Sequence, residues 1–172
     1  MQIVTVGRGE LEVSSDPDVV LLAESVCPSL VIAAYASAAR VGGVLNFEMP
    51  DSSADPARAK RQPGLYADTG ISLLIEEVCR RGAQKSQLQT RLSGGAPADA
   101  PPADATAVKR NYLAARKTLW KQGVVISAET FGHAGATTAG LQIRSGAPWP
   151  GSDESWNEGD ALPANAQLRT LS

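Results

Sequence analysis

The amino-acid sequence predicts a mixed α/β domain that combines several short strands with two long helices. Short apolar segments, many of them alternating between apolar and polar residues, recur in the first 50 residues and again near residues 90, 125 and 142. Helical periodicity is sustained in only two stretches, one near residue 75 and one near residue 115. Because these helices do not alternate with the strands as in βαβ units, the pattern favours a mixed arrangement over a doubly wound parallel sheet.

The first 50 residues are expected to form strands. Residues 3–6 and 10–13 alternate apolar and polar side chains on either side of two glycines, which predicts a hairpin. Further short apolar stretches predict three more strands, at residues 19–22, 30–35 and 41–49. The segment Ser25-Val26-Cys27-Pro28-Ser29 interrupts this regular pattern.

The first helix is expected near residue 75. Residues 51–64 are rich in proline, serine and charge, and predict a surface loop before it. Asp68 is a suitable N-cap, apolar residues then recur at helical spacing, and Arg80-Arg81-Gly82 provides cations and a glycine for the C-terminus.

The second helix is expected from about Ala107 to Gln122, where Gly123 stops it. A strand at residues 88–92 and a loop at residues 96–107, rich in alanine, proline and aspartate, precede it. Trp120 is expected to share the apolar face of this helix.

The C-terminal part is expected to add two strands and a tail. Residues 124–126 predict a buried strand, and residues 141–144 alternate as a last strand. From residue 146 onward the chain is mostly polar, so we divide it into a domain of residues 1–145 and a tail of residues 146–172. Trp149 and Trp156 could dock this tail on the domain or on a partner, and docking on the domain is the simpler interpretation.

Charge and composition argue against several functions. The net charge of −2 provides no basic surface for nucleic acid. No apolar run reaches the roughly 20 residues of a membrane-spanning helix, and the N-terminus lacks the pattern of a signal peptide, so a cytoplasmic protein is expected. Cys27 and Cys79 form no CxxC pair, so we expect no metal site, and no motif calls for a cofactor.

An ordered set of short motifs is similar to the CheD family of receptor-modifying chemotaxis proteins. The similarity runs from about residue 4 to residue 145. It is carried by Val6-Gly7, Asp16-Pro17, Tyr35, Gly42-Gly43-Val44, Met49-Pro50, Tyr66-Ala67-Asp68-Thr69, Arg81-Gly82-Ala83, Gly94-Gly95-Ala96, Arg110-Asn111 and Gly123-Val124.

The resemblance implies a compact α/β sandwich that hydrolyses the side-chain amide of glutamines on methyl-accepting chemotaxis receptors. A carboxamide is a poor electrophile, so in this family a cysteine thiolate attacks it while a histidine moves the proton and a threonine orients the pair. Placing this chain on the family pattern through Tyr35 and Gly42-Gly43 puts Ser29 at the cysteine, Asn46 at the histidine and Ala23 at the threonine. The resemblance therefore implies a catalytic set in which all three members are replaced.

Two other residues remain candidates for chemistry. Cys27 could act as a displaced nucleophile, because on a strand-like path it would point to the same side as Ser29. The alternative is a buried, unreactive thiol. His133 is the single histidine and could supply the base, although a lone histidine in a glycine-rich turn is more often exposed.

Two hypotheses follow from the resemblance. In the first, the protein binds without catalysis and engages the methylation region of a chemoreceptor or a CheC-type phosphatase. In the second, it remains a receptor glutamine deamidase that uses Cys27 or Ser29. Serine without a neighbouring imidazole is a poor nucleophile, which favours the first hypothesis.

Overall fold

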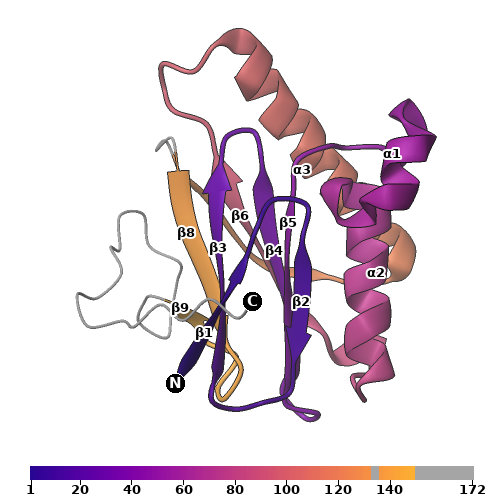
Figure 1. The fold of residues 1–172 in the computed structure, drawn as a ribbon, viewed down its shortest axis with the longest axis vertical. Helices are drawn as coiled ribbons and strands as arrows, with labels where there is room; N and C mark the ends of the chain where they lie inside the picture. The colour runs from indigo at the N-terminus through magenta and orange to yellow at the C-terminus, as the bar shows by residue number, and fades with distance from the viewer. Residues whose placement is uncertain (133–135, 150–172) are drawn as a thin grey trace.

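The structure, a computed structural model that describes residues 1–132 and 136–149, contains two β-sheets packed face to face, with helices against the outer face of one sheet (Figure 1). The principal elements are β1 Gln2–Val6, β2 Leu11–Ser14, β3 Val19–Val26, β4 Leu30–Ala36, β5 Val41–Phe47, α1 Pro56–Arg61, α2 Ala67–Arg80, β6 Gln89–Gly95, α3 Pro102–Gln122, β7 Ile126–Gly132, β8 Ala136–Gln142 and β9 Pro148–Trp149.

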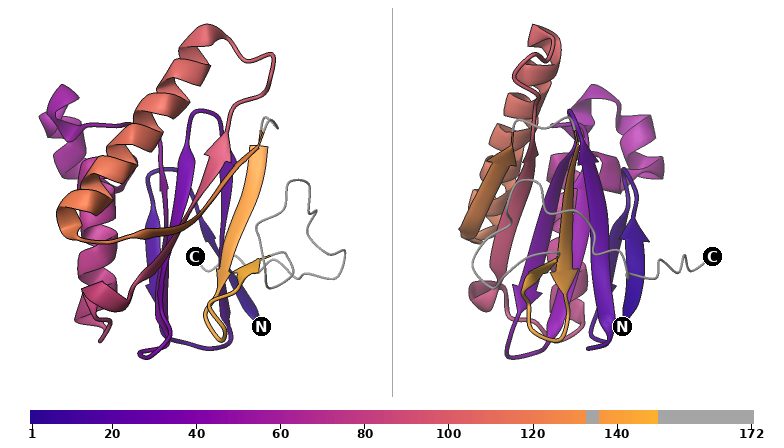
Figure 2. Two further views of the ribbon diagram at one scale, coloured as in Figure 1. Left: turned by 180° about the vertical axis from the view of Figure 1, so that it is seen from behind. Right: turned by 90° about the vertical axis from the view of Figure 1, so that its left-hand side faces the viewer.

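Both sheets mix parallel and antiparallel pairs, which confirms the predicted fold class. The first sheet has the order β1-β3-β8-β9, and β1 runs parallel to β3. The second has the order β2-β5-β4-β6-β7, and β7 runs parallel to β6. The helices all lie on the side of the second sheet, as the views from behind and from the side show (Figure 2).

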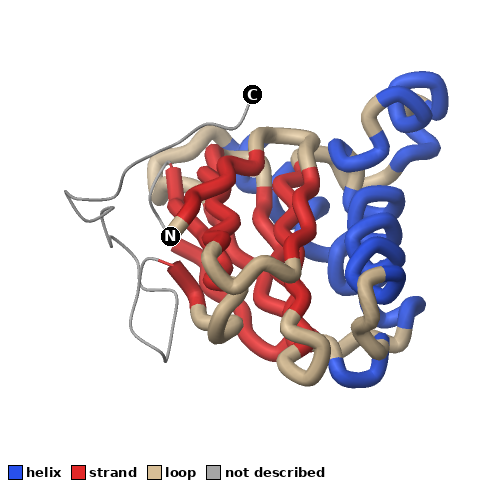
Figure 3. The backbone as a smooth tube through the Cα atoms, turned by 60° about the horizontal axis from the view of Figure 1, so that its bottom comes forward, coloured by secondary structure: helices blue, strands red, loops and turns tan. Residues whose placement is uncertain are grey.

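Two apolar cores hold the layers together. The core between the sheets contains Leu21 and Ala23 from β3, Val31 from β4 and Val44 from β5. The core between the second sheet and the helices is larger and includes Leu74 of α2. Colouring by secondary structure separates the strands on one side of the molecule from the helices on the other (Figure 3). None of the described helices combines the length and apolarity that crossing a membrane requires.

The expected N-terminal hairpin is wrong. β1 pairs with β3 in one sheet, whereas β2 pairs with β5 in the other, so the glycine-containing link between them passes from sheet to sheet. Alternating residues identify a strand but not its partner, and here each strand finds a partner distant in sequence.

The two long helices are confirmed, and their starts differ from expectation. Tyr66, not Asp68, occupies the N-cap of α2, and the Asp68 carboxylate accepts hydrogen bonds from the backbone N–H and hydroxyl of Ser52. α3 begins at Pro102, inside the expected loop, because proline suits the first turn of a helix. Gly123 ends α3 as predicted, with a left-handed φ of 71°.

Several connecting segments also depart from expectation. The loop expected at residues 51–64 contains α1 and two single-turn helices, Ser52–Ala54 and Pro63–Leu65. Val124 is buried, but Val125 is 74% exposed and β7 begins only at Ile126, so the buried strand expected at residues 124–126 is wrong.

The last described residues form a short strand, β9, which pairs with β8 and lies in the stretch assigned to the tail. There Trp149 packs against Ile3, Val20 and Leu22, in agreement with docking on the domain, whereas Trp156 lies outside the described residues. β8 covers residues 136–142 where a strand was expected at 141–144.

Candidate active site

The three positions singled out from the sequence meet where chain segments of both sheets converge. The turn after β3 carries the chain from the first sheet to β4 in the second, and Ser29 ends this turn. Asn46 lies on β5 and pairs with Val31 of β4. Val31 follows Ser29 by two residues and belongs to the core between the sheets. Ala23 is fully buried in that same core. The structure therefore brings together the three segments that carry these positions.

Ser29 holds the turn in shape rather than presenting a free hydroxyl. Its Oγ accepts a hydrogen bond from the backbone N–H of Val26 at 3.0 Å, and its own N–H donates to the carbonyl of Val26 at 2.9 Å. The hydroxyl of Ser25 donates to the carbonyl of Ser29 at 2.6 Å. Only 1% of Ser29 is exposed, so the side chain is enclosed by its own turn.

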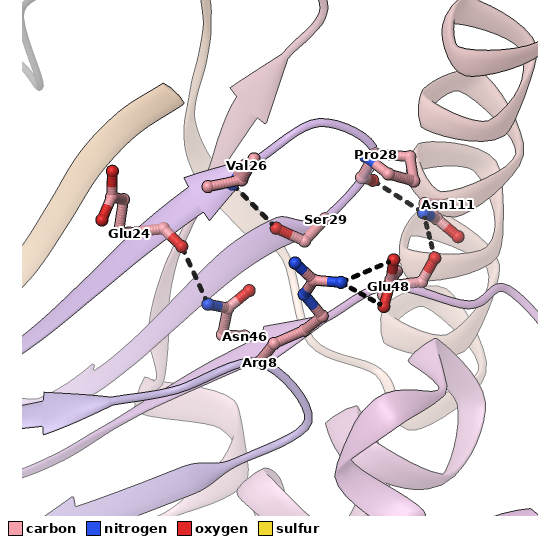
Figure 4. A network of polar contacts seen from close by, with 8 residues as sticks. All are labelled: Arg8, Glu24, Val26, Pro28, Ser29, Asn46, Glu48 and Asn111. Atoms are coloured by element: carbon pink, nitrogen blue, oxygen red, sulfur yellow. Dashed lines mark hydrogen bonds and ion pairs between the residues drawn. The ribbon is translucent and has the colours of Figure 1, made fainter. Parts of the chain in front are cut away.

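Asn46 joins the two sheets. Its Nδ2 donates to the backbone carbonyl of Glu24 on β3 at 3.0 Å, while its Oδ1 is buried without a hydrogen-bond partner (Figure 4). Asn46 and Ser29 make no hydrogen bond to each other. Among the hydrogen bonds of the described residues, none joins an ionisable side chain to either of them. An amide accepts and donates hydrogen bonds but cannot take up a proton at neutral pH.

Further polar atoms lie nearby on the second sheet. Val31 of β4 lies between Asn46 on β5 and Ser93 on β6. The Ser93 Oγ is buried and has no hydrogen-bond partner in the described part of the chain. Arg91 lies two residues earlier, and burial lowers the pKa of its guanidinium. Leaving such atoms unpaired in an apolar core is costly. The region between the sheets is therefore more polar than packing alone requires.

Cys27 lies in the turn itself. The strand-like path on which it was expected to share a side with Ser29 is wrong, because residues 27 and 28 form the turn between β3 and β4. Burial, and secondly the negative charge of Asp104, raises the pKa of the Cys27 thiol. A raised pKa lowers the thiolate fraction at neutral pH, which disfavours Cys27 as a nucleophile. His133, the other alternative, lies outside the described residues.

Residues that the sequence interpretation did not assign to the site complete it. Arg8 forms an ion pair with Glu48, which follows β5, at 3.2 Å. Gly9 places Arg8 there, because its N–H donates to the carbonyl of Asn46. Asn111 of α3 is fully buried, and its Nδ2 donates to the carbonyls of Pro28 at 2.9 Å and Glu48 at 2.6 Å (Figure 4). A polar residue on the buried face of a helix was the available signal for Asn111.

A pocket of about 640 Å³ adjoins this site. Pro28 and Glu48 border it on the side of the turn, and its wall is largely apolar with Arg110 and Asn111 among the lining residues. Within the described residues, no three His, Cys, Asp or Glu side chains are grouped as a metal site would require.

Comparison with known proteins places these features in context. The family model described as CheD chemotactic sensory transduction matches residues 49–149. A protein of Solibacter usitatus named "Probable chemoreceptor glutamine deamidase CheD" is 39% identical over 149 residues, covering 87% of this chain and 88% of its own. One from Anaeromyxobacter dehalogenans, "Probable chemoreceptor glutamine deamidase CheD 2", is 34% identical and covers 85% of this chain and 92% of its own.

Among solved structures, a Neisseria meningitidis protein of family DUF152 aligns with 77% of this chain and 63% of its own, at 10% identity and a TM-score of 0.46.

Proposed function

The chain belongs to the CheD family of chemotaxis proteins, and from this premise we propose that it binds chemoreceptors without deamidating them. The proposal rests chiefly on one observation. Ser29 and Asn46 are each hydrogen-bonded to backbone, and no ionisable side chain among the described residues is hydrogen-bonded to either. Amide hydrolysis needs a nucleophile and a group that takes its proton, and these two side chains supply neither an ionised nucleophile nor a base.

The proposed partner is the methylation region of a methyl-accepting chemotaxis receptor. Its relatives carry names that refer to chemoreceptors. The pocket beside the turn supports a binding role, because its apolar wall and the Arg110 side chain suit an amphipathic side chain of a helical segment. Receptor methylation regions lie on the cytoplasmic side, so this role implies a cytoplasmic location, and it needs no cofactor. A CheC-type phosphatase is the second partner that we propose to test.

Receptor glutamine deamidation by Cys27 or Ser29 is the alternative. The raised pKa of Cys27 and the enclosed hydroxyl of Ser29 both count against it. If it holds, changing Cys27 or Ser29 to alanine abolishes ammonia release.

The decisive experiment measures binding and chemistry on the same sample. The full chain is titrated with a chemoreceptor cytoplasmic fragment that carries glutamines in its methylation region, and ammonia is followed over hours. The related Solibacter usitatus protein serves as the matched comparison. We expect saturable binding with no ammonia above the background rate. Ammonia release by this chain contradicts the proposal, and absence of binding at high micromolar concentration and low salt removes the receptor as partner.

A further inference from the structure

The solvent face of α3 combines cations with large apolar side chains. Leu113 and Trp120 are 52% and 80% exposed. They are accompanied by five exposed cations, Lys109, Arg110, Arg116, Lys117 and Lys121. No aspartate or glutamate occurs between residues 105 and 122. We call these seven residues the basic α3 face.

Helical geometry gathers this face into one stripe. At 100° per residue, Leu113 and Trp120 lie within about 20° of each other, and the five cations flank them. The opposite side of the helix is buried through Asn111, Ala115, Thr118 and Leu119. The expectation that Trp120 shares the apolar face of this helix is wrong, because its side chain is on the exposed side, among the cations. Tryptophan and arginine are the residues that most often dominate the energy of protein interfaces.

Neighbouring residues extend the apolar part and shape it. Val125, which follows the helix, is 74% exposed. A hollow of about 530 Å³ lies on this side, lined by Trp120, Val125 and Ile126 among others. Another of about 430 Å³ lies along the other side of the helix and includes Leu113 and Lys117. The face therefore consists of an apolar ridge between two shallow grooves.

The cations of this face form no salt bridges within the described residues. The salt bridges of the described residues involve Arg8, Arg80 and Arg144, and none involves a cation of α3. Two partial exceptions exist. Arg116 donates to the Tyr112 hydroxyl, which also contacts the carboxylate of Glu129. Asp51 lies in the groove beside Lys117 and Lys121. Hydrogen bonds from Ser53, and to a smaller extent the charges of these two lysines, lower the pKa of its carboxyl group. The chain as a whole has a net charge of −2, so the positive potential is local to this helix.

We propose that the basic α3 face, together with Val125, binds an acidic amphipathic helix of a partner protein. Positive charge around an apolar centre complements a helix that has leucines on one side and glutamates beside them. A symmetric dimer through this face would place the same cations against each other. Nucleic acid fits less well, because the centre of the face is apolar rather than cationic. Arg110 borders both this face and the pocket beside the turn. The two roles are tested separately, because Lys117, Trp120 and Lys121 do not line that pocket.

The test uses a fluorescein-labelled synthetic helix with leucines on one side and glutamates elsewhere, titrated with the full chain and followed by anisotropy. A peptide with lysine in place of every glutamate is the control. We expect the acidic peptide alone to bind, and its binding to weaken as salt is raised. Trp120→Ala and the double variant Lys117→Glu with Lys121→Glu should each weaken binding at least about tenfold. The double variant Lys60→Glu with Arg61→Glu, which makes the same change of charge on α1, should leave it unaltered.

Three outcomes overturn the proposal. In the first, Trp120→Ala and the double variant bind the acidic peptide as tightly as the unaltered chain does, and circular dichroism shows that both variants are folded. The second is a concentration-dependent dimer that Trp120→Ala abolishes, which assigns the face to a second copy of the chain. The third is a DNA duplex that binds more tightly than the peptide at equal salt.

Discussion

At Ser29 and Asn46, ordinary acid–base chemistry decides what the site can do. A serine hydroxyl is scarcely ionised at neutral pH, whereas a few per cent of a free cysteine is thiolate. The Nδ2 of Asn46 donates a hydrogen bond to the carbonyl of Glu24, and its Oδ1 accepts none. This arrangement can orient a hydrogen-bond donor but cannot move a proton. Under the proposed non-catalytic function, side-chain identity rather than the position of the segments limits the chemistry.

Restoring the residue types should restore hydrolysis if that interpretation is correct. We expect the triple variant Ala23→Thr, Ser29→Cys and Asn46→His to release ammonia from a glutamine-bearing receptor fragment, because it supplies a thiolate and a base in adjacent segments. Ammonia is measured by a coupled assay. Adding Cys27→Ala should not reduce the gain. A folded triple variant that stays inactive would show that the segments are also misplaced.

Cys27 should react as a thiol of raised pKa. Its thiolate fraction at pH 7 is below that of a free cysteine, so alkylation by iodoacetamide is slower and accelerates as the pH rises past the ordinary cysteine range. The rate is measured in a Cys79→Ala background. Asp104→Asn removes one of the two causes of the raised pKa and should increase the rate at pH 7. A rate unaffected by pH between 7 and 9 is incompatible with this assignment.

Among the elements, α3 holds the turn after β3 and the end of β5 together at the site. It packs on the second sheet through Ala115 and Leu119, and Asn111 ties it to the turn after β3 and to the end of β5. Those two backbone segments carry Ser29 and Asn46, the positions that the family resemblance assigns to the cysteine and the histidine. Asn111 thus acts on the site by holding two backbone carbonyls in place.

Removing this tie should destabilise the protein. Asn111→Ala leaves the carbonyls of Pro28 and Glu48 without their donor, and we expect the free energy of unfolding to fall by about 2–4 kcal/mol. Urea denaturation followed by circular dichroism measures it. Lys109→Ala, on the exposed side of the same helix, should change it by less than about 0.5 kcal/mol. Equal effects of the two variants would contradict the role of Asn111.

Local sequence patterns predicted where the strands and helices lie better than they predicted which of them contact one another. The apolar runs that became β3, β4 and β5, and the periodicity of α2, were sufficient to predict these elements. Strand partners were not predictable, as β1 and β2 show, because pairing joins residues distant in sequence. The start of α3 was missed because a run of proline, alanine and aspartate is also typical of a loop. Arg8 entered the site only through tertiary contacts, which no spacing reveals. Asn111 could have been noticed as a polar residue on the buried face of its helix, but its partners could not.

For the whole molecule, the second sheet is the shared layer, since its two faces contribute to different cores. A change in either core therefore affects the layer that supports the other. Domains of this size usually unfold in one cooperative transition.

Substitutions in the two cores should accordingly lower the same unfolding transition. Leu21→Ala between the sheets and Leu74→Ala beneath the helices remove side chains that are 1% and 0% exposed. Each should reduce the free energy of unfolding by about 2–5 kcal/mol. Far-ultraviolet circular dichroism and tryptophan fluorescence should give coincident urea curves. Leu113→Ala, on the exposed side of α3, is the control, and two separated transitions would show that the layers unfold independently.

The position of β1 has a practical consequence for experiments on this protein. β1 forms an edge of the sheet that is remote from the helices, so the N-terminal residue lies in the opposite layer from α3. A biotin or affinity tag attached there would immobilise the molecule with its helical side turned away from a sensor chip. Surface-based binding assays can therefore be oriented without altering a residue of the helices.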